Sequence, residues 1–236
     1  MNINASHTAL LLFARTPDEE VLYKHILTGQ SLKRQKALFS SFNAQAENIL
    51  KATQLPYYIS NSSHQKEETF GARLYAALDD VFALEFENVL VIGNDCPALL
   101  PNNIKKAAAQ LLTQDVVLGP TDKGGIYLLG LNRNLFGKIK SLDEIRWQSA
   151  NVLEDLKSFF HQKNASIVCL DKLTDINQPT DLKKVVKHEF VSPLIRKIYF
   201  LTLCINKHWL SYLSLPSPLS FPAICHLVFR GPPKLV

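Results

Sequence analysis

The segment of residues 89–97, Val-Leu-Val-Ile-Gly-Asn-Asp-Cys-Pro, limits the possible folds more than any other part of this sequence. Its apolar first half is rich in β-branched residues, and it stops abruptly at Gly93, Asn94 and Asp95. A short apolar run bounded by turn residues is typical of a buried strand in a parallel sheet. Ligands of such α/β sheets bind beyond the carboxyl ends of the strands, where Asp95 would lie. Its carboxylate can face a metal ion or a ribose there, or it can cap a turn.

A second block continues this alternation of elements. Residues 115–120 and 126–131 are apolar runs that read as strands, and the polar turn between them contains Gly124 and Gly125. Residues 102–113 carry apolar side chains at helical spacing. The order strand, helix, strand, Gly-rich turn, strand predicts an α/β fold. Paired glycines let a backbone approach a ligand where a Cβ atom would clash.

The remaining chain up to about residue 190 follows the same pattern. We expect further strands over residues 8–14, 55–59 and 166–170, and helices over residues 31–53, 70–86 and 151–163. With 236 residues, 47% of them hydrophobic and 20% charged, the chain can form one globular domain. We therefore expect a single three-layer α/β domain over residues 1–190, with a mixed, mainly parallel sheet, followed by an extension over residues 191–236.

The extension over residues 191–236 differs from the body of the chain in composition. It contains no Asp or Glu, five of the 26 basic residues and six of the 12 prolines. The body therefore has balanced charge and no clustered basic groove, which argues against a nucleic-acid partner. A basic, aromatic segment without acids can make a peripheral contact with an anionic membrane surface, or it can be a poorly ordered extension.

The sequence predicts a cytoplasmic protein without a transmembrane segment. No apolar run reaches the roughly 20 residues that span a bilayer, and the first residues do not form a secretion signal. The four cysteines form no Cys-x-x-Cys pair, which argues against a zinc site and favours free thiols in a reducing compartment.

The blocks around Asp95 and Gly124 resemble an uncharacterised bacterial family of transferases with the glycosyltransferase-A fold. That family is related to molybdenum-cofactor guanylyltransferase and 2-phospho-L-lactate guanylyltransferase. Its pattern is Gly-Ser-Asp-Cys-Pro-x-Leu, then Asp-Val-Val-Leu-Gly-Pro, then Asp-Gly-Gly-Tyr-Tyr-Leu-Ile-Gly-Leu. This chain keeps the spacing and the residues Gly93, Asp95, Cys96, Pro97, Leu99, 115–120, Gly124, Gly125, Tyr127, Leu128, Gly130 and Leu131. The resemblance implies a fold like that of nucleotide-diphospho-sugar transferases.

The resemblance also implies a metal site built from two strand ends. In nucleotidyltransferases of this fold, an acid after the last strand joins the acid after the central strand around the metal. Residues 173–182 match the family's Asp-Val-Asp-Thr-Pro-x-Asp-Leu, so Asp95 and Asp175 would be the catalytic, metal-holding pair, with Asn177 in support. Residues 175 and 177 project on one face of an extended segment, which suits Mg²⁺ or Mn²⁺. We expect Thr180 and Asp181 to form a helix N-cap.

The loop after residues 8–14 departs from the family. The family has Pro-x-Pro-Gly-x-Val-Lys-Thr-Arg-Leu there, whereas this chain replaces the second Pro and the Gly by acids and displaces the lysine to Lys24. We expect Arg15 and Lys24 to bind the nucleotide, since such loops often cradle phosphate. The acids at residues 18–20 either start a solvated helix or repel a triphosphate.

Further candidate substrate-binding residues lie in three motifs. Gly124 and Gly125 would let the backbone close over the donor or acceptor, although Lys123 stands where the family has an Asp. Arg73 fits the family's Asp-Leu-Gly-x-Arg-Met and can bind a phosphate, or it can lie on a helix surface. Trp147 fits the family's Ile-x-Trp-Ser-Thr and can shape the acceptor pocket, or it can pack at a helix entry.

Two functions of different classes are consistent with these features. A metal-dependent enzyme would move a nucleotidyl or glycosyl group from a nucleoside triphosphate or nucleotide-sugar to a small acceptor. It needs no covalent nucleophile, and we expect Cys96 to pack in the core because no base is identifiable beside it. The altered first loop and Lys123 instead favour a catalytically impaired relative that acts as a binding or regulatory module.

Overall fold

The computed structural model describes residues 7–63 and 65–213, with side chains as far as residue 203. This part of the chain contains a six-stranded sheet in the order β2-β1-β3-β5-β4-β6. The strands are β1 (Thr8–Ala14), β2 (Tyr57–Asn61), β3 (Asn88–Ile92), β4 (Val116–Pro120), β5 (Ile126–Asn132) and β6 (Ile167–Cys169). Only β5 runs antiparallel to its neighbours β3 and β4, and the other pairings are parallel. The mixed, mainly parallel sheet is therefore confirmed.

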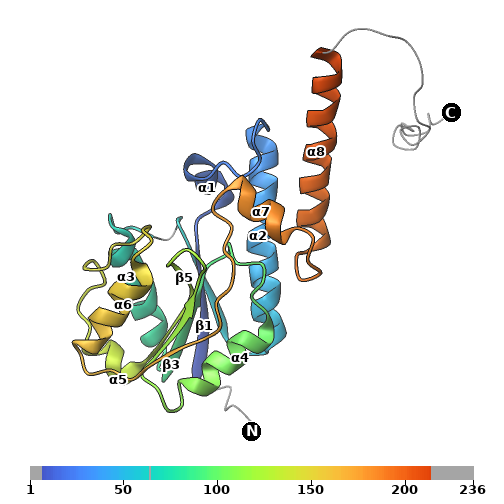
Figure 1. Ribbon diagram of the computed structural model, residues 1–236. Coiled ribbons are helices and arrows are strands. Elements are labelled where there is room, and N and C mark those ends of the chain that lie inside the picture. Colours follow the sequence, from blue (N-terminus) through green and yellow to red (C-terminus); the bar gives the residue numbers. More distant parts are fainter. Residues whose placement is uncertain (1–6, 64, 214–236) are drawn as a thin grey trace, which may run out of the picture. The chain divides into compact units, whose positions relative to one another are not determined.

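Helices cover both faces of the sheet, which makes three layers (Figure 1). One face carries α3 (Phe70–Phe82), α5 (Arg133–Phe136) and α6 (Val152–His161), and the other carries α2 (Leu32–Thr53) and α4 (Pro101–Gln110). In β1, Ala9 and Leu11 pack into the first core, whereas Leu10 and Leu12 pack into the second. Burial on both faces explains why the strands are continuous apolar runs.

A third apolar cluster lies beyond the carboxyl edge of the sheet. It joins the first half of α2 to α1 (Pro17–Tyr23), α7 (Pro179–Val185) and the start of α8 (Pro193–Leu213). Val21 of α1 and Ile176, which precedes α7, are both buried in this cluster. The cluster therefore holds α1 and the segment before α7 close to the ends of the strands.

The second half of the predicted extension, residues 214–236, lies outside the described residues. The first residues of the extension continue the packing of the body, because Val191 and Ile195 are fully buried in the third cluster. A boundary at residue 190, a poorly ordered extension and a peripheral membrane contact all stay predictions. Among the residues that the structure describes, no helix is both long and apolar enough to cross a membrane.

Several element boundaries differ by a few residues from the sequence-based expectation, and two of them have clear local reasons. The second strand begins at Tyr57, not at residue 55, because Gln54 ends α2 in a left-handed conformation and Pro56 has no N–H to donate. Helix α3 ends at Phe82, before Glu85 adopts a positive φ of 67°. The short helix α5 is not predicted by periodicity, and Asn132 caps it through a bond from the Leu135 N–H.

Asp115 ties three strands together at the opposite edge of the sheet. Its Oδ2 accepts hydrogen bonds from the Ser166 N–H at 2.9 Å and the Ser166 hydroxyl at 2.8 Å, and its Oδ1 accepts from Asn132 Nδ2 at 2.8 Å. The bond from the Ser166 backbone is the largest cause that lowers the pKa of Asp115 below its ordinary value. The charged form therefore stabilises the fold at neutral pH, and this contribution is lost as the pH falls through the lowered pKa.

We expect Asp115→Asn to lower the free energy of unfolding by about 1–3 kcal/mol at pH 7, since an amide cannot accept all three bonds. The difference from the wild type should shrink as the pH falls below about 4, where the carboxyl of the unfolded chain takes up a proton, and it should vanish below the lowered pKa of the folded protein. Urea unfolding at pH 7 and at acidic pH measures both effects. Asp80→Asn, on the exposed face of α3, is the control and should have little effect. Equal stability of Asp115→Asn and the wild type at pH 7 would contradict the assignment.

Candidate functional site

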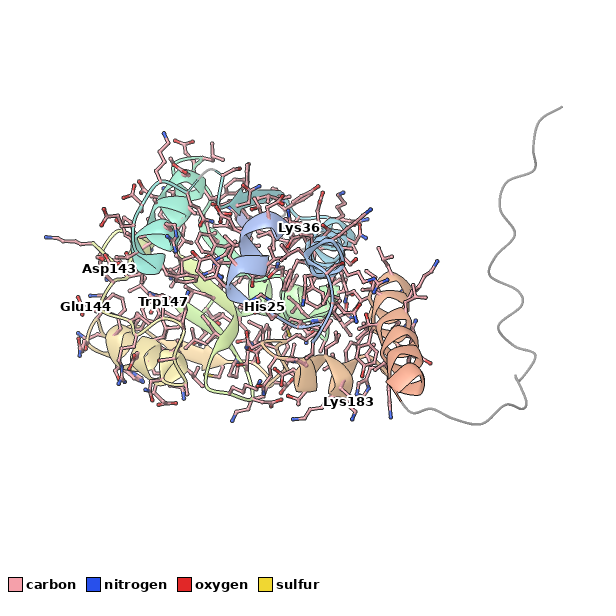
Figure 2. The ribbon with its side chains drawn as sticks, turned by 90° about the horizontal axis from the view of Figure 1, so that it is seen from above. His25, Lys36, Asp143, Glu144, Trp147 and Lys183 are labelled. Atoms are coloured by element: carbon pink, nitrogen blue, oxygen red, sulfur yellow. The ribbon has the colours of Figure 1, made fainter. Side chains whose placement is uncertain are left out.

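The loops that follow β1, β3, β4 and β6 meet at the carboxyl edge of the sheet. Figure 2 looks onto this edge, with His25, just beyond α1, near its middle and Asp143, Glu144 and Trp147 to one side. Parallel strands bring residues far apart in sequence to the same edge, which is where ligands of open α/β sheets bind. Most of the predicted site residues belong to these loops, so the fold gathers them at one edge.

Asp95, just beyond β3, is paired with a lysine from the first loop. Its Oδ2 accepts a hydrogen bond from Lys24 Nζ at 2.8 Å, and Lys24 Nζ also lies 3.5 Å from Glu20 Oε1. Burial alone would lower the pKa of Lys24, but the charges of Asp95 and Glu20 outweigh it and raise that pKa. Lys24 is therefore protonated at neutral pH, and its ammonium group is hydrogen-bonded to the predicted metal ligand Asp95.

The sequence of the first loop explains why Lys24 reaches this position. Thr16 caps α1 by accepting the Glu19 N–H, Pro17 opens the helix, and the acids at residues 18–20 occupy its first turn. The prediction that these acids start a helix is confirmed, but Glu20 points inward and is only 5% exposed. It pairs with Arg15 at 3.2 Å and with Lys24 one helical turn later.

Asp175 is brought next to Asp95 by a main-chain contact. The Ile176 N–H donates to the Asp95 carbonyl oxygen at 2.8 Å, which joins the loops after β6 and β3. Burial, and then the negative charge of Asp95, raise the pKa of Asp175. Asp175 Oδ2 accepts from Asn177 Nδ2 at 2.5 Å, whereas its Oδ1 is a buried oxygen with no hydrogen-bond partner in the described part of the chain.

Asp95, Asp175 and Asn177 have the oxygen atoms that a divalent cation prefers, but one of these oxygens is already hydrogen-bonded to Lys24. Two carboxylates with a nearby amide are suitable oxygen donors, and the unpartnered Oδ1 of Asp175 can accept a cation. One oxygen of Asp95 is held by Lys24. Within the described residues, no cluster of three or more His, Cys, Asp or Glu side chains could hold a metal. Asp95, Asp175 and Asn177 are thus the candidate ligands, and a bound phosphate or water would have to supply others.

Lys123 forms a second ion pair, which local sequence patterns did not predict. Its Nζ lies 2.5 Å from Oδ2 of Asp181, a side chain that is only 1% exposed. The same oxygen accepts the N–H groups of Asn177 and Gln178 at 3.0 Å each. The predicted N-cap at Thr180 and Asp181 is wrong in position, because the helix starts at Pro179 and its N-cap is Gln178. The acid three residues after Gln178 was a usable signal, since side chains at that position reach back to the cap.

The Gly-rich turn is packed against the start of α6. Gly124 has a φ of +81°, and a Cβ atom there would lie 2.0 Å from the Ala150 carbonyl oxygen. Its own carbonyl oxygen accepts the Leu153 N–H at 2.9 Å. A Cβ atom on Gly125 would be 3.1 Å from Thr121 Oγ1. The close approach that Gly124 permits is therefore to another part of the protein.

The remaining candidates make contacts within the fold. Arg15 lies over the Tyr23 ring at 4.2 Å in addition to pairing with Glu20. Arg73 donates to the carbonyl oxygens of Glu67 and Glu68. The Trp147 ring packs on Phe70 at 4.9 Å and its Nε1 donates to the Leu142 carbonyl at 2.8 Å. These contacts favour the structural alternatives for Arg73 and Trp147, whose roles in substrate binding stay predictions.

Cys96, next to Asp95 in the sequence, lines a small hollow together with residues of α2. Burial, and then the charge of Asp95, raise the pKa of the Cys96 thiol, which agrees with a packing role. The thiol is 6% exposed and belongs to the core on the α2 face. The hollow is lined by Phe42, Gln45, Ala46, Ile49, Gly93, Asn94, Cys96, Pro97 and Leu99.

Comparisons with known proteins agree with this description of the fold. The family described as "Uncharacterized protein conserved in bacteria (DUF2064)" matches residues 32–149. The 2-phospho-L-lactate guanylyltransferase of Methanocaldococcus infernus is 27% identical over 143 residues, which are 59% of this chain and 63% of that protein. The chain thus spans less than two thirds of the length of this relative. The resemblance found in the sequence is confirmed.

A solved structure extends the likeness over most of the fold. A candidate nucleotide-diphospho-sugar transferase from Desulfovibrio desulfuricans G20 superposes with a TM-score of 0.70 at 19% identity. The superposition covers 89% of this chain and 100% of that chain. It confirms the predicted fold class.

We expect Gly124→Ala to destabilise the protein by more than about 3 kcal/mol, because it adds a clash with Ala150 to an unfavourable backbone conformation. Gly29→Ala is a matched control, since Gly29 has a φ of +70° but open space around the added Cβ atom. The control should lose only about 1–2 kcal/mol. Chemical denaturation compares the two variants. Similar losses in both would show that the contact with Ala150 does not constrain residue 124.

Proposed function

Since the chain belongs to the DUF2064 family, we propose that it is a metal-dependent nucleotidyltransferase acting on a small acceptor. The observation that carries this proposal is the meeting of Asp95 and Asp175 at the ends of β3 and β6. The similarity to a guanylyltransferase favours transfer of a nucleotidyl group over transfer of a glycosyl group. It also makes GTP the first donor to test.

The proposed reaction depends on charge and position, without a covalent intermediate. An oxygen atom of the acceptor attacks the α-phosphorus of the nucleoside triphosphate. The bond to the β-phosphate then breaks, pyrophosphate leaves and the acceptor proton passes to solvent. Asp95 and Asp175, with Asn177 beside them, would hold Mg²⁺ or Mn²⁺, which neutralises phosphate charge when bound. Lys24 and Lys123 place two ammonium groups beside these acids, where they can pair with phosphate oxygens and orient the donor.

A second candidate function has its own support in the first loop. Lys24 already neutralises Asp95, and the buried Glu20 adds negative charge where the related family has a glycine. Both features would weaken the binding of a metal–triphosphate complex. A catalytically impaired relative that acts as a binding or regulatory module is the function that these features favour.

We expect the wild type to bind one or more nucleoside triphosphates only when Mg²⁺ is present. Isothermal titration with GTP, the other nucleoside triphosphates and nucleotide-sugars, each with and without Mg²⁺, measures this. Asp95→Asn should weaken binding by at least about tenfold, because it removes the charge of a proposed metal ligand. Asp171→Asn is the matched control and should bind like the wild type, since Asp171 also follows β6 but its side chain is 84% exposed.

The outcome separates the two candidate functions. Metal-dependent binding that is lost in Asp95→Asn and kept in Asp171→Asn supports the transferase and identifies its donor. A protein shown by circular dichroism to be folded, yet binding no member of the panel, would refute the transferase and favour the binding module.

A further inference from the structure

The candidate site holds two lysine–aspartate ion pairs near Asp175. Lys24 binds Asp95 at 2.8 Å, and Lys123 binds Asp181 at 2.5 Å. Asp175 interacts electrostatically with one member of each pair, Asp95 and Lys123. Oδ1 is without a hydrogen-bond partner among the described residues in both Asp175 and Asp181. Asp181 is paired with Lys123 through Oδ2, whereas no ion pair of the described residues involves Asp175. Two of the three acids are therefore neutralised by lysines before any ligand binds, and Asp175 is the one that is not.

Lys24 is held in place by the packing of α1. Val21 anchors the helix in the third apolar cluster, and the pair between Arg15 and Glu20 fixes its inner face. The Lys24 N–H completes the last turn by donating to the Glu20 carbonyl oxygen at 2.9 Å. The Lys24 side chain is only 20% exposed. Its ammonium group is thus a built part of the site, unlike a mobile surface lysine.

An ammonium group in this position opposes the binding of a free divalent cation. A cation that approaches Asp95 and Asp175 meets a positive charge already hydrogen-bonded to Asp95 Oδ2. Like charges repel strongly in a partly buried site, where water screens them poorly. Phosphate groups remove this obstacle to metal binding, because their oxygens can pair with the ammonium group of Lys24 and can also coordinate the metal.

We propose that Lys24 occupies the cation position at Asp95 in the nucleotide-free protein, so that the divalent ion binds strongly only together with a phosphate-bearing donor. Lys24 then determines the metal affinity of the free protein and the order in which metal and donor bind. This inference rests on the proposed function in one respect, namely that Asp95 and Asp175 are the metal ligands.

A titration of the nucleotide-free protein with Mn²⁺, followed by electron paramagnetic resonance of the unbound ion, tests the proposal. We expect weak binding by the wild type and a dissociation constant at least about tenfold lower for Lys24→Met, which removes the competing charge. Lys36→Met is the matched control, because Lys36 of α2 also pairs with an acid, Asp18 of α1, which is not a proposed metal ligand. It should bind Mn²⁺ like the wild type.

Two further variants keep the test decisive. The gain should disappear in the double variant Lys24→Met with Asp95→Asn, which would place the new binding at Asp95. If Lys24→Met does not fold, as judged by circular dichroism, Lys24→Gln replaces it, since an amide can still hydrogen-bond to Asp95 without carrying charge. Tight Mn²⁺ binding by the wild type, or no gain in the folded Lys24 variant, would overturn the proposal.

The result is distinguishable from the outcome for the proposed function. A gain in Mn²⁺ affinity in the Lys24 variant supports the role of Lys24 even if the wild type binds no nucleotide in the donor panel. Metal-dependent nucleotide binding by the wild type, together with no gain in the Lys24 variant, leaves the transferase standing and removes Lys24 as the competing cation.

Discussion

The candidate site depends on one main-chain hydrogen bond, from the Ile176 N–H to the Asp95 carbonyl oxygen. It joins the loop after β6 to the loop after β3, and so sets Asp175 beside Asp95. The Ile176 side chain is fully buried in the same cluster as Val21 of α1. One residue therefore links three segments, and the cluster around it holds α1 where Lys24 can reach Asp95. Because this hydrogen bond joins main-chain atoms, the contact between the two loops does not depend on the charges of the side chains of Asp95 and Asp175.

Asp95 and Asp181 are nevertheless each paired with a lysine, and the second of these pairs distinguishes the chain from the family pattern that it resembles. The position before Gly124 is an Asp in that pattern and is Lys123 here, facing the buried carboxylate of Asp181. The family pattern also has an Asp at the position of Asp181, so two acids stand where this chain has a lysine and an acid. Lys123 thus gives the buried carboxylate of Asp181 a cationic partner inside the chain. Lys24, which is displaced by one position relative to the family's lysine, likewise has an acidic partner inside the chain. Glu20 lies one helical turn before it and pairs with its ammonium group.

Most of the fold could be predicted from local patterns. The strands are short apolar runs buried on both faces, and the helices carry one apolar stripe, so periodicity locates both. Boundaries were missed where a single residue interrupts the pattern, as Pro56 does before β2. The role of Gly124 could not be derived in the same way. A glycine that admits a ligand and a glycine that packs on Ala150 have the same sequence signature, and only the neighbouring backbone distinguishes them.

The order of the amino acids by itself determined three things: the α/β class, the strand ends that carry acids, and the family resemblance that pointed to Asp95 and Asp175. These are properties of short segments, in which side-chain periodicity and turn residues act over a few positions. Which charges meet is known only from the folded chain. Lys24 and Asp95 are 71 residues apart, and Lys123 and Asp181 are 58 residues apart. Coulombic pairing depends on distance in space, and no local pattern encodes that distance before the sheet has brought the strand ends together.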